Sequence, residues 1–304
     1  MITVLSGGVG AARLLRVLRD ARDARQLRAV VNVGDDLVMH GLTICPDLDT
    51  ILYTLAGLNN DETGWGLAGE SWRVMDELTA LGGESWFRLG DRDLATHLYR
   101  SQRLAAGATK TLVSAELAAS LGVAVTLLPV TDDPVSTVFE TGLGRLSFQE
   151  YFVRHHHEIP VTRVEIVGAT AARPTAVALA ALNEAERIVI APSNPVISID
   201  PILQIPGIRD ALARRRTDVV AVSPIVNGAA LKGPADRLLG ELGYDVSCVG
   251  VADFYGELVG TWVIDHADAG HADELTRRGF DVRVTTTIMG RADHDVALAA
   301  AVLT

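Results

Sequence analysis

The chain has 304 residues, 48% of them hydrophobic, and a formal net charge of −11 at pH 7. This length allows one large domain, or two small ones, with a sizeable hydrophobic core. The acidic balance argues against a nucleic-acid-binding protein, because such proteins normally present a basic face. An acidic protein that binds anionic ligands needs local compensation from helix N-termini, a few cationic side chains or a metal ion.

The two cysteines, Cys45 and Cys248, have no metal-ligating partner at close spacing in the sequence. We therefore expect two structural thiols in a reduced, cytoplasmic protein. The N-terminal apolar run lacks the basic region of a secretion signal. No run approaches eighteen consecutive apolar residues, so a membrane span is not expected.

The hydrophobic pattern predicts strands that alternate with helices towards both ends of the chain. The expected strands are Ile2–Leu5, Leu27–Val33, Val123–Leu128, Val164–Val167, Arg187–Ala191, Val219–Val222, Trp262–Ile264 and Val282–Val284. Continuous apolar strands are typical of a parallel sheet that is covered on both faces. The pattern therefore predicts a single α/β domain over residues 1–304, with a doubly wound, mainly parallel, Rossmann-like sheet.

Two segments interrupt this alternation. Residues of about 60–122 predict a largely helical insertion, and residues of about 135–160 predict a hairpin around Gly142 and Gly144 followed by a short helix. In doubly wound sheets ligands bind at the carboxyl ends of the strands, so the residues that follow each strand are the candidates for a site.

The first such segment is SGGVGAAR, between the first strand and a helix expected over Ala11–Asp20. Neither the dinucleotide template nor the Walker A pattern fits, because Arg13 stands where the dinucleotide template needs its third glycine and no Gly-Lys-Ser/Thr follows. A glycine turn that opens a helix remains, and its amides around Gly8 and Gly10 could hold a phosphate. The alternative is a tight structural turn.

Acidic residues follow next. Asp35 and Asp36 come directly after the second strand and suit either a ribose contact or Mg²⁺, with a solvated turn as the alternative. Asp47 and Asp49 lie at the start of a helix expected over residues 46–57. We expect Asp47 to cap that helix and at most one of the two carboxylates to face a site.

Other polar clusters carry weaker signals. Asp93 and His97 are four apart on an expected helix, which suits either a metal or a capping acid with a partly buried histidine. The run His155–His157 cannot place three consecutive rings around one ion, so we expect it to be solvated or to lie at the edge of a ligand.

Two later loops complete the candidate site. Ser193 and Asn194 follow one strand and offer hydroxyl and amide contacts, and Lys232 in a glycine-containing loop after the next strand offers a charge for phosphate. Because these loops meet at one sheet edge with the glycine turn, the sequence predicts a site for a nucleotide or diphosphate.

Taken together, these motifs resemble the 2-phospho-L-lactate transferase family, which acts in biosynthesis of the deazaflavin coenzyme F-420. The motifs are SGGVGAARL, VNVGDD, CPDLDTILYTLAG, RLGDRDLATHLYRS, LLPVTDDPVST, FQEYFVR, APSNPVISIDPILQIPGIR and VSPIVNGAALKGPADRLL. They run in order from the N-terminus to about Tyr255 and are most similar to the actinobacterial branch, whose members transfer a phosphoenolpyruvyl group.

The resemblance implies a transferase of substituted phosphate groups that uses Mg²⁺. Its acceptor would be the deazaflavin Fo, whose terminal ribityl hydroxyl attacks a GDP-activated enolpyruvyl or lactyl donor and releases GMP. The resemblance also implies a homodimer, for which the helical insertion is a candidate interface. Direct transfer of the labile donor from the guanylyltransferase that makes it is a further hypothesis.

The resemblance also implies roles for particular residues. Asp49 and Arg88 would contact the acceptor, with Asp49 as the catalytic carboxylate, and we expect Asp49→Ala to abolish transfer without disturbing the fold. The expected metal ligands are Asp35 or Asp36 together with Asp49. The expected nucleotide and phosphate contacts are Gly8, Gly10, Ser193, Asn194 and Lys232.

Two other functions compete with this one. The first is a nucleotide-sugar-binding regulator from a related branch of the same fold, which is similar at the glycine turn. That branch lacks the LGDRDLATH stretch, which this chain contains. An NAD-dependent dehydrogenase is disfavoured by the failed glycine spacing and by the lack of an evident hydride-transfer constellation.

Overall fold

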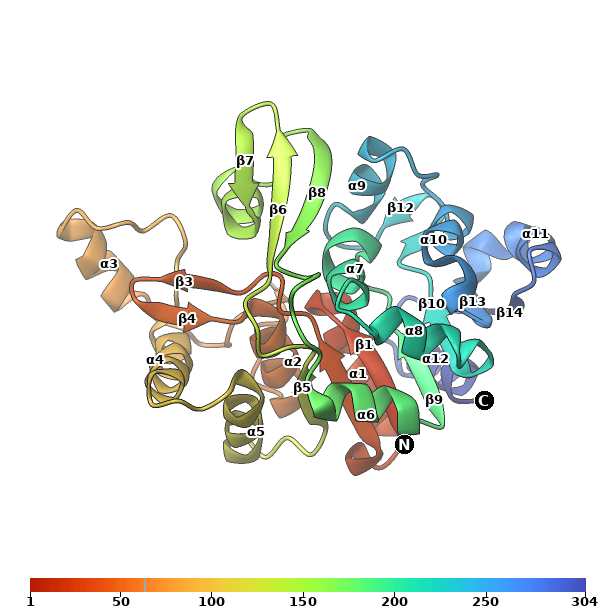
Figure 1. The fold of residues 1–304 in the computed structure, drawn as a ribbon, viewed down its shortest axis with the longest axis horizontal. Coiled ribbons are helices and arrows are strands. Elements are labelled where there is room, and N and C mark those ends of the chain that lie inside the picture. Colours follow the sequence, from red (N-terminus) through yellow and green to blue (C-terminus); the bar gives the residue numbers. More distant parts are fainter. Residues whose placement is uncertain (63) are drawn as a thin grey trace.

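A seven-stranded parallel sheet forms the centre of the computed structural model, which describes residues 1–62 and 64–304 (Figure 1). From one edge to the other, its strands are β14 (Asp281–Thr285), β13 (Thr261–Asp265), β10 (Val219–Val222), β9 (Arg187–Ile190), β1 (Ile2–Ser6), β2 (Leu27–Val31) and β5 (Thr126–Pro129). Every neighbouring pair is parallel. The predicted doubly wound α/β fold is confirmed.

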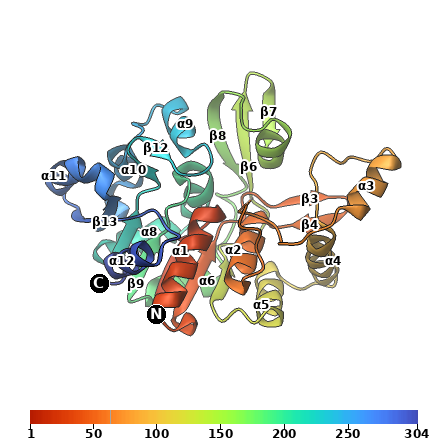
Figure 2. The same cartoon turned by 180° about the vertical axis from the view of Figure 1, so that it is seen from behind.

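The central strands are apolar along their whole length because helices cover both faces of the sheet. Successive side chains of β1 point to opposite faces, so Ile2 and Val4 join one hydrophobic cluster and Leu5 joins the other. The first cluster is covered by α1 (Gly8–Ala21), α2 (Pro46–Ala56), α5 (Lys110–Ser120) and α12 (Ala292–Leu303). Figure 2 shows α1 and α12 on this face.

The opposite face is covered by the remaining helices of the second half. They are α6 (Ala176–Glu184), α7 (Asp200–Leu203), α8 (Ile208–Ala213), α9 (Ala235–Glu241), α10 (Cys248–Tyr255) and α11 (Ala272–Arg277). Short 3-10 helices at 24–26, 216–218, 256–258 and 266–271, and π-helical turns at 150–154 and 195–199, complete the connections. Among the helices of the described residues, none has the length and apolar character needed to span a bilayer.

Between β2 and β5 the chain leaves the sheet. It forms a hairpin of β3 (Leu37–Met39) and β4 (Leu42–Ile44), which the sequence did not predict, and then α2, α3 (Arg73–Ala80), α4 (Asp91–Ala105) and α5. Figure 1 shows β3, β4, α3 and α4 projecting to one side of the sheet. The predicted insertion of residues 60–122 therefore holds α3, α4 and α5.

A second excursion follows β5. The hairpin of β6 (Ser136–Thr141) and β7 (Gly144–Ser147) continues into β8 (Val161–Val167), and the three strands form an antiparallel sheet of their own. The prediction that Val164–Val167 belongs to the regular alternation of the central sheet is wrong. Side chains of β8 are partly exposed, because only one face of the small antiparallel sheet packs against the core.

The strand order reverses at β1. The chain runs from β1 to β2 on one side and returns much later to β9 on the other, so the loops that follow β1 and β9 diverge. In open α/β sheets this switch point is where a crevice forms. A small hairpin of β11 (Ile225–Val226) and β12 (Ala229–Ala230) lies after β10 on the way to α9.

Candidate active site

A cavity of about 1000 Å³ lies at this switch point. Its lining includes residues from the loops that follow five strands of the central sheet: Gly7 after β1, Asp35 after β2, Pro192 and Ser193 after β9, Ser223 after β10 and Thr287 after β14. Side chains from α2, α4, the loop before α4 and the segment after β12 complete the wall. The predicted sheet edge is therefore the location of the main cavity.

The glycine turn after β1 opens α1 at the cavity. Gly8 has φ of 66°, a left-handed conformation that favours glycine, and its N–H donates to Asp47 Oδ1 at 2.7 Å. A Cβ on Gly10 would lie 2.3 Å from the carbonyl oxygen of Pro192. Both glycines line the cavity, but Gly10 also has a packing role, since it lets the loops after β1 and β9 touch.

The loop after β9 combines one fixed and one free polar group. Ser193 is buried, and its hydroxyl donates to the carbonyl of Gly7 at 2.6 Å, so it ties the two loops together. Asn194 accepts from the N–H of Val196 at 3.0 Å. Its buried Nδ2 has no hydrogen-bond partner among the described residues. Because buried donors are normally paired, this amide is suited to bind an acceptor atom of a ligand.

Besides Arg88, which pairs with Asp76, two cationic side chains line the cavity: Arg13 on the second turn of α1 and Lys232 after β12. Neither forms an ion pair or hydrogen bond with the described part of the chain. Two unneutralised cations beside the N-terminus of a 14-residue helix create a positive region in an otherwise acidic protein. Arg13, which breaks the dinucleotide template, was missed as a candidate although its position on α1 was visible.

Two buried carboxylates, Asp35 and Asp47, lie beside the glycine turn, where Asp47 accepts from the N–H of Gly8. Asn32 Nδ2 donates to both Asp35 Oδ1 at 3.1 Å and Asp47 Oδ2 at 2.9 Å, so one amide bridges the pair. Burial raises the pKa of Asp47 to about 7. Burial and then the charge of Asp47 raise the pKa of Asp35 well above its ordinary value. Two carboxylates held this close fit a divalent cation.

Asp36, the neighbour of Asp35, is placed differently. Its side chain forms an ion pair with Lys110 at the start of α5, and it is not part of the cavity lining. Alternation along the chain sends the two adjacent carboxylates in different directions. Of the two, the structure brings only Asp35 to the cavity.

Asp49 lies on α2 and is held by Arg100 from α4. Both carboxylate oxygens accept from the guanidinium, with Arg100 Nη1 to Oδ2 at 3.0 Å. Both side chains are buried. Burial raises the pKa of Asp49, while the positive charge of Arg100 opposes that shift. Both Asp47 and Asp49 line the cavity, so the expectation that at most one would face a site is wrong, and the N-cap of α2 is Cys45 rather than Asp47.

His97 on α4 lies between Asp49 on α2 and Asp93 on its own helix. Its Nδ1 lies 3.8 Å from Asp49 Oδ2, and its Nε2 lies 3.3 Å from Asp93 Oδ2. Tyr53 donates to Asp93 Oδ1 at 2.5 Å. Burial alone would raise the pKa of Asp93, but the hydrogen bond and charge of His97 outweigh it and lower the pKa. The predicted pairing of Asp93 and His97 on one face of a helix is confirmed, and it extends to Asp49 as a cluster that could hold a metal.

Aromatic side chains form another part of the cavity wall. They are Trp65, Trp86, Phe87, Phe148 and Phe152. Arg88 also lines the cavity, but its exposed guanidinium pairs with Asp76 at 2.7 Å and lies 5.1 Å from the Trp72 ring. A wall of rings is suited to bind a flat conjugated ligand.

His156 and His157 lie at the edge of the same cavity. Both have left-handed φ angles, 49° and 47°, which are uncommon for residues other than glycine. Burial lowers the pKa of His157. The expectation that the histidine run is solvated or lies at the edge of a ligand stays a prediction, since the structure places only His156 and His157 in the cavity lining.

The fold and this lining define a class: an α/β protein with a glycine turn at a helix N-terminus, a buried acidic cluster and aromatic side chains in one cavity. Comparison with known proteins narrows that class. Residues 2–292 match the model of the family described as 2-phospho-L-lactate transferase CofD. The chain belongs to this family and is a transferase.

Curated relatives agree over nearly the whole chain. A phosphoenolpyruvate transferase of Streptomyces griseus is 42% identical and covers 98% of this chain and 96% of its own. The phosphoenolpyruvate transferase of Thermobifida fusca is 43% identical, and the match covers 99% of this chain and 96% of that protein. The phosphoenolpyruvate transferase of Mycobacterium tuberculosis is 39% identical, and the match covers 97% of this chain and 98% of that protein.

Solved structures agree on the fold. A crystal structure of a UPF0052-family protein from Bacillus halodurans has a TM-score of 0.63 and covers 100% of this chain and 98% of its own, at 17% identity. A second structure of a Bacillus halodurans protein has a TM-score of 0.62 at 18% identity, covering 100% and 99%. At this identity the likeness concerns the fold alone.

Proposed function

We propose that this transferase moves a phosphoenolpyruvyl group from a GDP-activated donor to the terminal ribityl hydroxyl of the deazaflavin Fo, with release of GMP. The observation that carries the proposal is that one cavity combines an unneutralised cationic region, buried carboxylates and an aromatic wall. The names of the curated relatives support phosphoenolpyruvate as the source of the transferred group. A phospholactyl donor is the alternative within the same reaction.

The cationic region suits the diphosphate of the donor. Arg13 and Lys232 carry charge without a partner among residues 1–62 and 64–304, and the α1 N-terminus adds a partial positive charge. The unpaired Nδ2 of Asn194 offers a further donor. Gly8 and Gly10 let the backbone come close to a phosphate. Ser193, whose hydroxyl is engaged with Gly7, would act by shaping the loop.

The carboxylates suit the chemistry of transfer. The attacking hydroxyl forms a new bond to the phosphorus next to the enolpyruvyl group, the bond from that phosphorus to GMP breaks, and the hydroxyl loses its proton. Asp49 lines the cavity, and Arg100 fixes both of its oxygens, so it is the proposed group that orients the hydroxyl and accepts the proton. Such transfers depend mainly on positioning and on charge stabilisation.

The residues present also fit a magnesium ion. Asp35 and Asp47 are buried together and share one Asn32 donor, and burial is the largest cause of their raised pKa values. We propose this pair as the metal ligands. Asp36 and Asp49 fit less well, because each is paired with a basic side chain. A magnesium ion at this pair would stabilise negative charge on the diphosphate.

The aromatic wall suits the acceptor. Trp86, Phe148 and Phe152 could contact the faces of the deazaflavin rings. Arg88 is held in the cavity wall by Asp76 and Trp72, and from this position it is proposed to contact the deazaflavin Fo.

The test is a transfer assay with Mg²⁺, Fo and a guanylyltransferase that generates the donor from either phosphoenolpyruvate or 2-phospholactate. Mass spectrometry should detect the enolpyruvyl product in preference to the lactyl product. Fluorescence titration should show Fo binding at micromolar concentrations. Donor binding without product in a folded, Mg²⁺-loaded sample would contradict the proposal and favour a nucleotide-binding regulator.

Variants of α1 sharpen this test. Arg13→Gln should raise KM for the donor roughly 10-fold or more, because a charge-assisted hydrogen bond is lost. Arg16→Gln is the matched control, since Arg16 lies on the same helix but does not line the cavity. Equal effects of the two substitutions would remove Arg13 from the site.

A further inference from the structure

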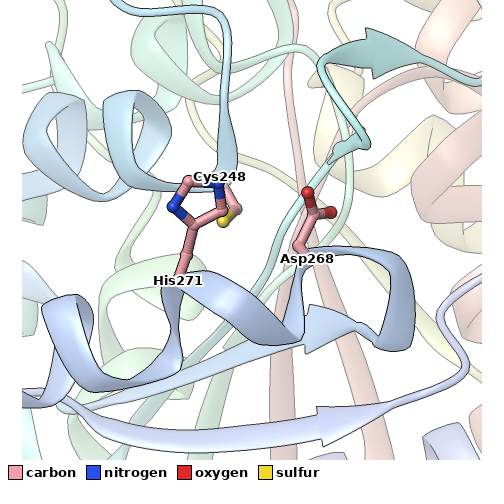
Figure 3. A group of neighbouring side chains, drawn as sticks. All are labelled: Cys248, Asp268 and His271. Atoms are coloured by element: carbon pink, nitrogen blue, oxygen red, sulfur yellow. The ribbon is translucent and has the colours of Figure 1, made fainter.

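A second group of ligating side chains lies outside the cavity lining. Cys248, Asp268 and His271 each present one ligating atom, and these three atoms all lie within 4.8 Å of one another. Figure 3 shows Cys248 reaching down from α10 towards Asp268 and His271, which rise from the 3-10 segment below it. The sequence did not reveal this group, because its members are up to 23 residues apart (271 − 248) and Cys248 had no partner at close spacing.

Local structure orients each member. Cys248 is the first residue of α10, and the N-cap Ser247 fixes this end by accepting from the N–H groups of Val249 and Gly250 at 3.2 and 3.0 Å. Asp268 and His271 lie on the 3-10 helix His266–His271 that follows β13. Residues three apart on a 3-10 helix lie one above the other, so both side chains face α10.

The burial and charge of the group suit a cation. Cys248 is fully buried and Asp268 is 4% exposed, while the side chain of His271 is partly exposed and leaves a route from solvent. Both oxygens of Asp268 accept from the N–H of Asn227 at 3.1 Å, which fixes the carboxylate and leaves further lone pairs. Glu274 Oε2 lies 3.9 Å from His271 Nδ1, while Oε1 of the same carboxylate is paired with Arg278 at 2.6 Å.

We propose that Cys248, Asp268 and His271 form a site for a zinc-class transition metal ion. Thiolate, imidazole and carboxylate are the three ligand types that Zn²⁺ takes in proteins, whereas Mg²⁺ prefers oxygen alone. Three protein ligands leave a fourth position, which water or the Glu274 carboxylate would fill. This site is separate from the proposed magnesium pair in both place and chemistry.

A bound ion would brace a part of the fold that adjoins the active site. It would link the start of α10 to the connection between β13 and α11. Asp268 also holds Asn227, the left-handed turn residue of the β11–β12 hairpin. The segment after that hairpin carries Lys232. We therefore expect the ion to stabilise the protein and the hairpin rather than to take part in transfer.

The test is titration of the metal-free protein with Co²⁺ in excess Mg²⁺, which occupies oxygen-rich sites. We expect stoichiometric binding with a thiolate-to-cobalt charge-transfer band in the near ultraviolet, and displacement of Co²⁺ by Zn²⁺. Cys248→Ser should abolish the band. His271→Ala should weaken Co²⁺ binding by more than roughly 10-fold, since even outer-shell changes have effects of that size.

Controls make the outcome decisive. His266→Ala removes an exposed histidine of the same 3-10 segment and should leave the band unchanged. Circular dichroism of each metal-free variant checks the fold, and the partly exposed His271 provides a variant that keeps the thiol if Cys248→Ser fails to fold. Absence of the band in the native protein, its survival in Cys248→Ser, or an unchanged Co²⁺ affinity in His271→Ala would overturn the proposal.

Discussion

The buried contact between Asp49 and Arg100 means that a substitution at either residue affects the stability of the fold as well as the site. Their side chains are both buried and joined by two hydrogen bonds. Removing either partner leaves the other charge uncompensated inside the protein. The expectation that Asp49→Ala would leave the fold undisturbed therefore conflicts with this contact, which the sequence did not disclose because the partners are 51 positions apart.

A double-mutant cycle separates the two roles of Asp49. Asp49→Ala and Arg100→Ala should each lower the free energy of unfolding by about 3–5 kcal/mol. The double variant should be destabilised by clearly less than the sum, because it leaves no unpaired charge. Urea denaturation measures both effects. Transfer should be absent in Asp49→Ala and in the double variant, and restored transfer in the double variant would exclude Asp49 as the catalytic carboxylate.

The carboxylate pair predicts a dependence of stability on pH. The pKa values of Asp35 and Asp47 are raised in the folded state, the latter to about 7, so the folded protein binds protons more tightly than the unfolded chain. Stability contributed by these protons is present below about pH 4 and is lost as pH rises through about 7. Without metal, the protein should become less stable over this window.

The Asp35→Asn variant tests whether this pH dependence of stability comes from the carboxylate pair. At pH 8 without metal it should stabilise the protein by about 1–2 kcal/mol, because one of two buried charges is gone. The gain should shrink as pH falls below about 7, where the native pair takes up protons. Mg²⁺ should raise the melting temperature of the native protein at pH 8 but not that of the variant. A gain that grows towards low pH would contradict the assignment.

At the scale of elements, the site depends on two loops that touch. The loop after β1 approaches the loop after β9 so closely that only glycine fits at position 10. Ser193 adds a hydrogen bond from the second loop to Gly7 of the first. The cavity wall at the switch point is therefore set by packing between segments that are about 180 residues apart in the chain.

Gly10→Ala tests that contact. Its Cβ would meet the carbonyl oxygen of Pro192 at 2.3 Å, so one loop must shift, and we expect a loss of about 1–3 kcal/mol in the free energy of unfolding. Gly142→Ala in the β6–β7 turn is the control, because nothing lies within 4 Å of its added Cβ. Thermal or urea denaturation compares the two. Equal stability of both variants would show that the loops are not in close contact.

Elements with a strong local pattern were predictable. Continuous apolar strands and amphipathic helices identified the central sheet, because burial on both faces leaves a clear signature in the sequence. Val164–Val167 was misplaced because a short apolar run does not reveal which sheet it joins. The β3–β4 hairpin was missed because Leu37–Met39 and Leu42–Ile44 are only three residues long.

At the scale of the whole molecule, the excursion between β2 and β5 presents apolar side chains to solvent. Val38 on β3, Leu98 on α4 and Leu112 on α5 are 73%, 57% and 47% exposed. Helix α4 contacts α5 and also β4, the strand that pairs with β3 (Figure 1). We propose that this region, which includes the insertion, is the interface of the homodimer that the sequence resemblance implied, since exposed apolar surface marks association sites.

Leu98→Asp should therefore shift the protein from dimer to monomer in sedimentation or light-scattering measurements. A buried charge at an apolar contact is unfavourable, whereas the same charge in water is not. Val296→Asp is the control, because Val296 is 71% exposed but lies on α12, away from the insertion. A monomeric native protein, or a dimer that Leu98→Asp leaves intact, would contradict this interface.

The sequence by itself determined much of the strand and helix pattern, the family resemblance and a set of candidate site residues of which only Asp36 lies outside the cavity lining, because residues that follow parallel strands must meet at one edge of the sheet. Only the tertiary structure decided the partners. It paired Asp36 with Lys110 and Asp49 with Arg100, and it brought the carboxylate of Asp35 close to that of Asp47. It also gathered Cys248, Asp268 and His271. Such contacts join distant segments, and their geometry depends on packing that no local pattern encodes.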